Sequence, residues 1–176
     1  MKILTLPPPR MWPLVVSIAA ALKGDEELQT ILGTTLAAPH VWGTRAPALT
    51  PDDVAAYQGR IIVRLPAALP YTAARRLPRG LKFDTLRPIT VDVVVEHTNP
   101  QGKYTPELSI EAAHRRVFEL LDGRTLALAD GRMAVPLEQP RGGEPTPSVI
   151  DDRDGLYYST ARYKTLLQSE PDGGTS

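Results

Sequence analysis

The chain has 176 residues, which suits one domain with a proper hydrophobic core. Twenty lysines and arginines balance twenty aspartates and glutamates, so no overall field draws the protein to nucleic acid or to an anionic membrane. There is no cysteine, which excludes disulfides, a thiolate nucleophile and a zinc site built on cysteine.

The 18 prolines divide the chain into stiff and helix-permitting parts. They cluster at 7–9, 66–70, 78–88 and 136–147, and they leave 14–35 and 107–121 free. Because proline interrupts helices and stiffens extended chain, this distribution predicts two helical regions in a compact core with several extended connections.

Residues 1–11 are predicted to form an extended arm that ends in polyproline geometry. A helix follows over about residues 13–23, with its apolar side chains on one side. This apolar run also resembles the core of a targeting peptide behind Arg10, but it is too short to cross a bilayer, which takes about 20 apolar residues. We therefore favour a buried core helix and expect no membrane contact.

Two further helical turns are expected. Asp25 can cap a short helix over 26–32, and Gly33 ends that run. Asp52 and Asp53 follow a Thr-Pro pair, a pattern more typical of the start of a helical turn than of an ion site.

Strands are predicted, in chain order, at 40–45, 60–66, 88–99, 131–139 and 154–168. The strand over 88–99 gives the strongest signal, because valine and isoleucine alternate along it. Asp92 and Glu96 fall on its opposite face, which we expect to meet solvent or a partner. The strand over 131–139 gives a weaker signal.

This order predicts an α+β fold in which a mostly antiparallel sheet packs against two helices. We expect a single domain over 12–168, from which 66–88 protrudes, and a disordered tail over 169–176.

Two of the three histidines lie in the stretch from Glu96 to Arg116. We interpret this stretch as a strand, a turn and an amphipathic helix that begins at Thr105 and Pro106. Glu111 and His114 have a spacing found among metal ligands, but this occurs once and His97 lies on another element. We expect a solvated helix face and a strand-end histidine, rather than a metal or acid–base site.

No phosphate-binding glycine loop, nucleophile elbow or zinc-protease motif occurs. The sequence therefore predicts no catalytic, metal-binding or cofactor-binding residue, and we expect a protein that is not an enzyme and carries no cofactor.

The connection over 66–88 is longer than the roughly 12–15 residues usual for a structureless loop in a compact domain. It is rich in proline and basic residues, and we predict partner contacts at Tyr71, Arg75, Arg76, Arg79, Lys82 and Phe83. We favour an arm or hairpin lying on a neighbouring subunit, because stiffening by proline reduces the entropy lost on docking. A meandering or disordered loop and a nucleic-acid contact are the alternatives. Tyr157 and Tyr163 on the final strand are predicted as further contacts.

The order and spacing of these elements resemble a known family. The pattern comprises Trp12, Leu14, Ala21, Leu22, Asp25, Leu28, Ile31 and Leu32; then paired strands and an alternating valine strand; then Ala113, Val117, Leu120 and Leu121; and a final strand from Arg153 to Tyr163. Over residues 12–168 it resembles the tail terminator, or tail completion, proteins of long-tailed bacteriophages and related gene-transfer particles. The arm at 66–88 is richer in proline and basic residues than that family pattern.

The resemblance implies a structural virion protein of the tail and neck, assembled in the host cytoplasm. Such a protein forms a homo-hexameric ring on the head-proximal end of the tail tube, halts polymerisation of the tube protein and presents a docking surface for the head connector. DNA passes through the lumen without sequence-specific binding. A head-closure or adaptor protein of the neck is the alternative within the virion, and a small enzyme or ligand-binding α+β domain is the alternative outside it.

Overall fold

The computed structural model describes residues 12–55, 58–66, 86–98, 105–128, 136–151 and 156–168. Their elements are α1 (Trp12–Lys23), α2 (Glu26–Ile31), β1 (Val41–Gly43), α3 (Pro51–Ala55), β2 (Gly59–Arg64), β3 (Leu86–Thr98), α4 (Pro106–Leu121), β4 (Val149–Asp151) and β5 (Leu156–Gln168). The extended arm predicted at 1–11, the disordered tail predicted at 169–176, and the part of the 66–88 arm between 67 and 85 lie outside the described residues.

The described strands form one sheet in the order β1-β2-β3-β5-β4. β1 runs parallel to β2, and the other neighbours are antiparallel. β3 and β5 pair along their whole lengths, from Leu86 opposite Gln168 to Thr98 opposite Leu156. The predicted α+β class with a mostly antiparallel sheet is confirmed.

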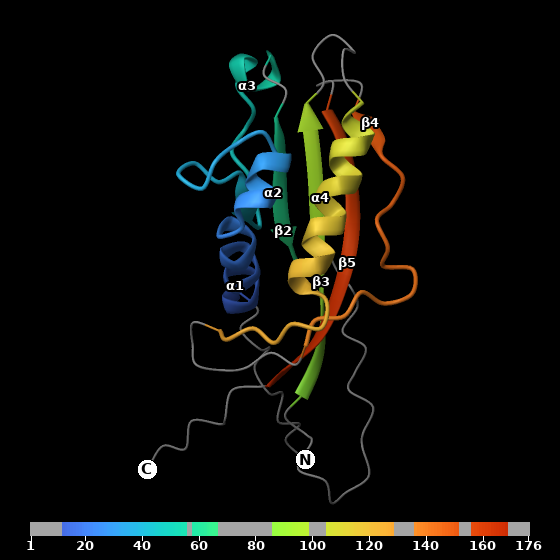
Figure 1. Ribbon diagram of the computed structural model, residues 1–176. Coiled ribbons are helices and arrows are strands. Elements are labelled where there is room, and N and C mark those ends of the chain that lie inside the picture. The colour runs from blue at the N-terminus through green and yellow to red at the C-terminus, as the bar shows by residue number, and fades with distance from the viewer. Residues whose placement is uncertain are drawn as a thin grey trace, which may run out of the picture.

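Helices α1, α2 and α4 lie against one face of this sheet (Figure 1). The hydrophobic core fills the space between the two layers. From the helices it takes Leu14, Val15, Ile18, Leu22, Leu28, Leu32, Ile110, Ala113, Val117 and Leu121, and from the strands Ile61, Val63, Val91, Val93, Val95, Ala161, Tyr163 and Leu167. Because side chains alternate along a strand, the residues between these strand positions point to the other face of the sheet.

Local sequence signals explain where the helices begin and end. Asp25 caps α2, and its Oδ1 accepts a hydrogen bond of 2.8 Å from the backbone nitrogen of Leu28. Thr105 stands at the predicted start of α4, but its side chain makes no capping hydrogen bond, and Pro106 fixes the first turn instead. Gly33 and Gly123, just past α2 and α4, both have positive φ, which glycine adopts at little cost.

The expectation of a strand over 131–139 needs correction. Residues 131–135 lie outside the described residues, while Leu137 and Glu138 make only isolated bridges, to Asp122 and Lys164. Beyond this point the chain follows the edge of β5, where the backbone oxygen of Gly143 accepts a 2.8 Å hydrogen bond from the backbone nitrogen of Arg162. Strand β4 was not predicted from the sequence, because the proline-containing stretch before it has no alternating pattern.

Candidate interaction surface

The face of the sheet opposite the helices carries charged side chains that pair across strands. Arg60 on β2 forms an ion pair with Glu96 on β3. Four residues along the same strand, Asp92 accepts a 2.8 Å hydrogen bond from Nε of Arg162 on β5. Val94 lies between the two pairs on β3 and is almost completely buried. The two pairs therefore link β2, β3 and β5 across this face of the sheet.

Positive charge gathers around Asp92. Arg64 is opposite Asp92 in the register, Arg162 binds it from the other side, and Lys164 follows two residues later on the same face. All three cations are exposed, whereas Asp92 is 5% exposed. The hydrogen bond to Asp92 raises the pKa of Arg162, so this guanidinium stays charged. We call these four residues the basic sheet patch.

Negative charge gathers on the opposite side of the molecule, where α2 meets α4. Arg116 of α4 binds Asp25 through two hydrogen bonds, with Nε–Oδ1 at 3.0 Å and Nη2–Oδ2 at 2.7 Å. Its Nη1 lies 3.0 Å from Glu27 and 2.9 Å from Glu119. Glu26 is exposed beside them. We call these five residues the acidic helix patch.

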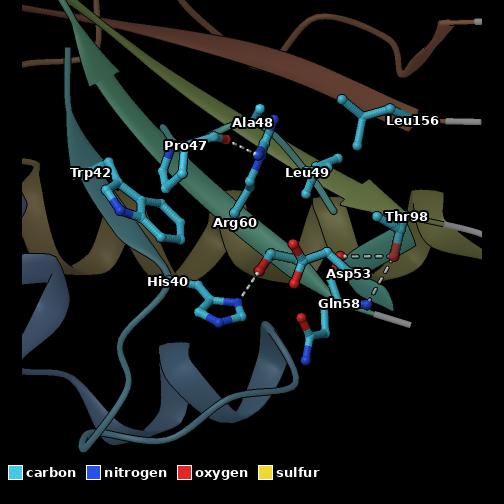
Figure 2. A pocket seen from close by; sticks show the side chains of 11 residues that line it. His40, Trp42, Pro47, Ala48, Leu49, Asp53, Gln58, Arg60, Thr98 and Leu156 are labelled. Atoms are coloured by element: carbon cyan, nitrogen blue, oxygen red, sulfur yellow. Dashed lines mark hydrogen bonds between the residues drawn. The ribbon is translucent and has the colours of Figure 1, made fainter. Parts of the chain in front are cut away.

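A small cavity of about 150 Å³ lies between β2 and the segment before α3 (Figure 2). Its polar groups are largely occupied by each other. His40 Nδ1 lies 3.2 Å from the backbone oxygen of Gly59, and Nη1 of Arg60 donates to the backbone oxygen of Pro47 at 3.0 Å.

Asp53 completes the capping turn of α3. Its Oδ2 accepts 2.7 Å hydrogen bonds from both the hydroxyl and the backbone nitrogen of Thr50, and these bonds lower the pKa of Asp53. The prediction that Asp52 and Asp53 begin a helical turn is confirmed, since both lie in α3. The cavity is therefore lined by side chains that already serve the fold.

The expectation of a solvated His114 is wrong. His114 is 2% exposed, because it lies on α4 between the buried positions Ile110 and Val117. Burial lowers the pKa of His114 to about 4, against a smaller opposing contribution from the backbone of Ser159 on β5. His114 lies four residues after Ile110 and three residues before Val117, a spacing that puts all three side chains on one face of the helix. This spacing was the sequence signal that His114 is buried.

His97 is also buried, at 1% exposure, and its Nδ1 lies 3.0 Å from the backbone oxygen of Thr98. Burial lowers its pKa as well. Among the described residues, no group of three or more histidines and carboxylates is arranged to hold a metal ion.

The predicted contact residues separate into three groups. Tyr71, Arg75, Arg76, Arg79, Lys82 and Phe83 lie outside the described residues. Tyr157 is half-buried and packs against the core. Tyr163 is completely buried, which corrects its assignment as a partner contact, because residues 161, 163 and 167 of β5 share the face under the helices. Asp92 was expected on a face that meets solvent or a partner, but the other charged residues of the two patches were missed as contacts, since pairs such as Arg116 with Asp25 join positions far apart in the sequence.

Comparisons with known proteins are sparse. No protein-family model matches the chain, and no curated protein matches it. Among solved structures, a chain described as "Virion of native gene transfer agent (GTA) particle" has a TM-score of 0.49 and 16% sequence identity, and the alignment covers 89% of this chain and 95% of that one. No helix in the described part of the chain is both long and apolar enough to cross a membrane.

Proposed function

We propose that the chain is a structural protein of a virion with a long tail. It forms a ring on the head-proximal end of the tail tube, stops further polymerisation of the tube protein and provides the docking surface for the head connector. The observation that carries this proposal is the form of the sheet: helices α1, α2 and α4 lie on one face, and the other presents exposed charged residues beside exposed Leu166. A broad surface of this kind suits contact with another protein.

The sequence resemblance to tail terminator proteins also supports the proposal. Its elements occur in the structure in the expected order: two helices, the paired strands β1 and β2, the alternating valine strand β3, the helix α4 and the long strand β5. The alternating valines of β3 and the apolar positions of α4 pack against each other in one core.

A role without catalysis fits the chemistry of the cavity. Arg60, Asp53 and His40 are each held by neighbouring groups of the same chain, so they are occupied in keeping the segment before α3 on the sheet. In this role the protein works through its surfaces and needs no cofactor.

The test is an assembly assay. The purified protein is analysed by native mass and by negative-stain microscopy, alone and with the tail-tube protein of the same particle. We expect closed rings, most simply hexamers, and tubes that stop growing once the protein is added. Binding to the head connector without binding to the tube would assign the protein to head closure instead. A monomer that ignores both partners would refute a role in the neck.

A further inference from the structure

We propose that neighbouring subunits join by docking the basic sheet patch of one copy on the acidic helix patch of the next. This inference rests on the proposed ring and names the contact that builds it. The occupant of each patch is therefore a second copy of this chain.

The charges of the two patches are complementary. The basic sheet patch places three cations, Arg64, Arg162 and Lys164, around the single carboxylate of Asp92. The acidic helix patch places the carboxylates of Asp25, Glu27 and Glu119 around Arg116, and Glu26, next to Asp25 in the chain, adds a fourth exposed carboxylate. The whole chain is neutral, so these are local excesses of opposite sign rather than a consequence of composition.

The charges that a partner needs are accessible. Arg64 and Lys164 are exposed and form no ion pair with a described residue, and the same holds for Glu26. Glu27 and Glu119 bind Arg116 yet leave 64% and 52% of their side chains exposed. Each carboxylate thus keeps acceptor positions free for a cation from outside.

Exposed apolar side chains accompany both patches. Leu166 is 38% exposed and follows Lys164 on the same face of β5. On α4, Phe118 is 40% exposed and precedes Glu119. Single exposed ion pairs contribute little, so burial of these apolar groups would supply much of the affinity while the charges set the register.

The geometry determines the kind of contact. The basic sheet patch lies on the outer face of the sheet, whereas the acidic helix patch lies on the opposite side of the two-layer molecule, over α2 and α4 (Figure 1). A contact between two different surfaces is heterologous, and it generates a ring when the rotation between copies closes.

The sheet face is large enough for such a contact. At about 3.3 Å per residue and about 4.8 Å between strands, the sheet presents a projected area on the order of 600 Å². This is similar to the roughly 800 Å² that each partner buries in a standard interface.

Charge reversal tests the contact. The variant Arg64→Glu with Lys164→Glu reverses the basic sheet patch, and Glu26→Lys with Glu119→Lys reverses the acidic helix patch. We expect each to raise the dissociation constant for self-association, measured by sedimentation or on tube ends, by roughly tenfold or more. The matched control, Arg45→Glu with Arg141→Glu, makes the same charge change at exposed residues outside both patches and should associate like the wild type.

Mixing the two reversed variants gives a sharper result. In an alternating assembly every contact again joins opposite charges, so an equal mixture should regain association although neither variant associates alone. This recovery also shows that both variants are folded. A mixture that stays dissociated while circular dichroism shows both variants folded would overturn the proposed contact.

Site-specific cross-linking provides an independent measurement, because the chain has no cysteine of its own. Lys164→Cys mixed with Glu27→Cys should form a disulfide-linked dimer, and neither variant should do so by itself. If the wild type forms rings but no cross-link appears and charge reversal changes nothing, this contact fails and the proposed function stands. If the wild type never associates, alone or on tube ends, both fail.

Discussion

Arg116 and Asp25, 91 positions apart in the sequence, are joined by two hydrogen bonds of 3.0 and 2.7 Å. Asp25 uses the same carboxylate to cap α2, and Arg116 also contacts Glu27 and Glu119. One carboxylate therefore fixes both the start of α2 and its position against α4, and through them the acidic helix patch.

Replacing Asp25 should separate these two roles. Asp25→Ala removes the cap and the ion pair and should lower the free energy of unfolding by about 2 kcal/mol. Asp25→Asn retains a good capping side chain and should cost about 1 kcal/mol less than alanine. Urea unfolding of the three proteins measures both differences; equal losses in the two variants would show that the cap contributes nothing.

The same carboxylate should make stability depend on acid. The hydrogen bond from Arg116 lowers the pKa of Asp25, so the folded state favours the ionised form. Its contribution is present above the ordinary pKa of aspartate and is lost as the pH falls through the lower folded value. Asp25→Asn should remove this part of the acid dependence.

His114 should make the fold sensitive to milder acid. Its folded pKa of about 4 lies below the value of about 6.5 in an unfolded chain, so the unfolded state binds the extra proton between these values. Stability should therefore fall as the pH drops from about 6.5 to about 4, by up to about 3 kcal/mol.

The control for this effect is His114→Leu, which keeps an apolar side chain at the site and leaves His97 in place. The variant should lose most of this pH dependence in urea unfolding, with the remainder due to His97. If the free energy of unfolding changed with pH as it does in the wild type, the assignment of this effect to His114 would be wrong. His114→Ala should lower stability by about 2 kcal/mol or more, because it leaves a cavity under α4.

Tyr163 should tolerate loss of its hydroxyl but not of its ring. Its hydroxyl makes no hydrogen bond to a described residue, and burial raises its pKa, with a further contribution from the charge of Asp122. Tyr163→Phe should change the free energy of unfolding by less than about 1 kcal/mol. Tyr163→Ala should lower it by about 3 to 5 kcal/mol, because it leaves a cavity in the core. If a stable Tyr163→Phe protein failed to assemble, Tyr163 would have to be a partner contact despite its burial.

Gly143 should not tolerate a larger residue, because there is no room for a Cβ atom at this position. A Cβ built on Gly143 would lie 2.6 Å from the backbone oxygen of Arg162 and 2.8 Å from Cδ of Pro140. Gly143→Ala should therefore lower stability by about 1 to 3 kcal/mol. Gly24→Ala is the matched control, since its nearest atoms would be 3.7 Å away; thermal unfolding that affects both variants equally would contradict this reasoning.

The arm over 66–88 remains a prediction from sequence. Arg75→Glu with Arg76→Glu should weaken ring or tube assembly while leaving circular dichroism and thermal stability unchanged, because it reverses charge on a segment expected to contact a neighbour. The variant Arg45→Glu with Arg141→Glu is again the matched control. Normal assembly of the Arg75 and Arg76 variant would favour a loop without a partner.

The amino-acid sequence by itself determined the local structure. The helical spacing of Leu14, Ile18 and Leu22, the alternation of Val91, Val93 and Val95, and the cap at Asp25 each depend on residues a few positions apart. Such short-range periodicity identifies an element and its buried side without knowledge of its neighbours. The α+β class followed from the order of these elements.

Only the tertiary structure decided which charges and polar groups meet. Asp92 with Arg162 and Asp25 with Arg116 depend on strand register and on the packing of α2 against α4, which place distant residues within hydrogen-bonding distance. His114 and Tyr163 are polar enough for a surface but are covered by the opposing layer. Burial depends on what packs above a side chain, and a single chain segment does not contain that information.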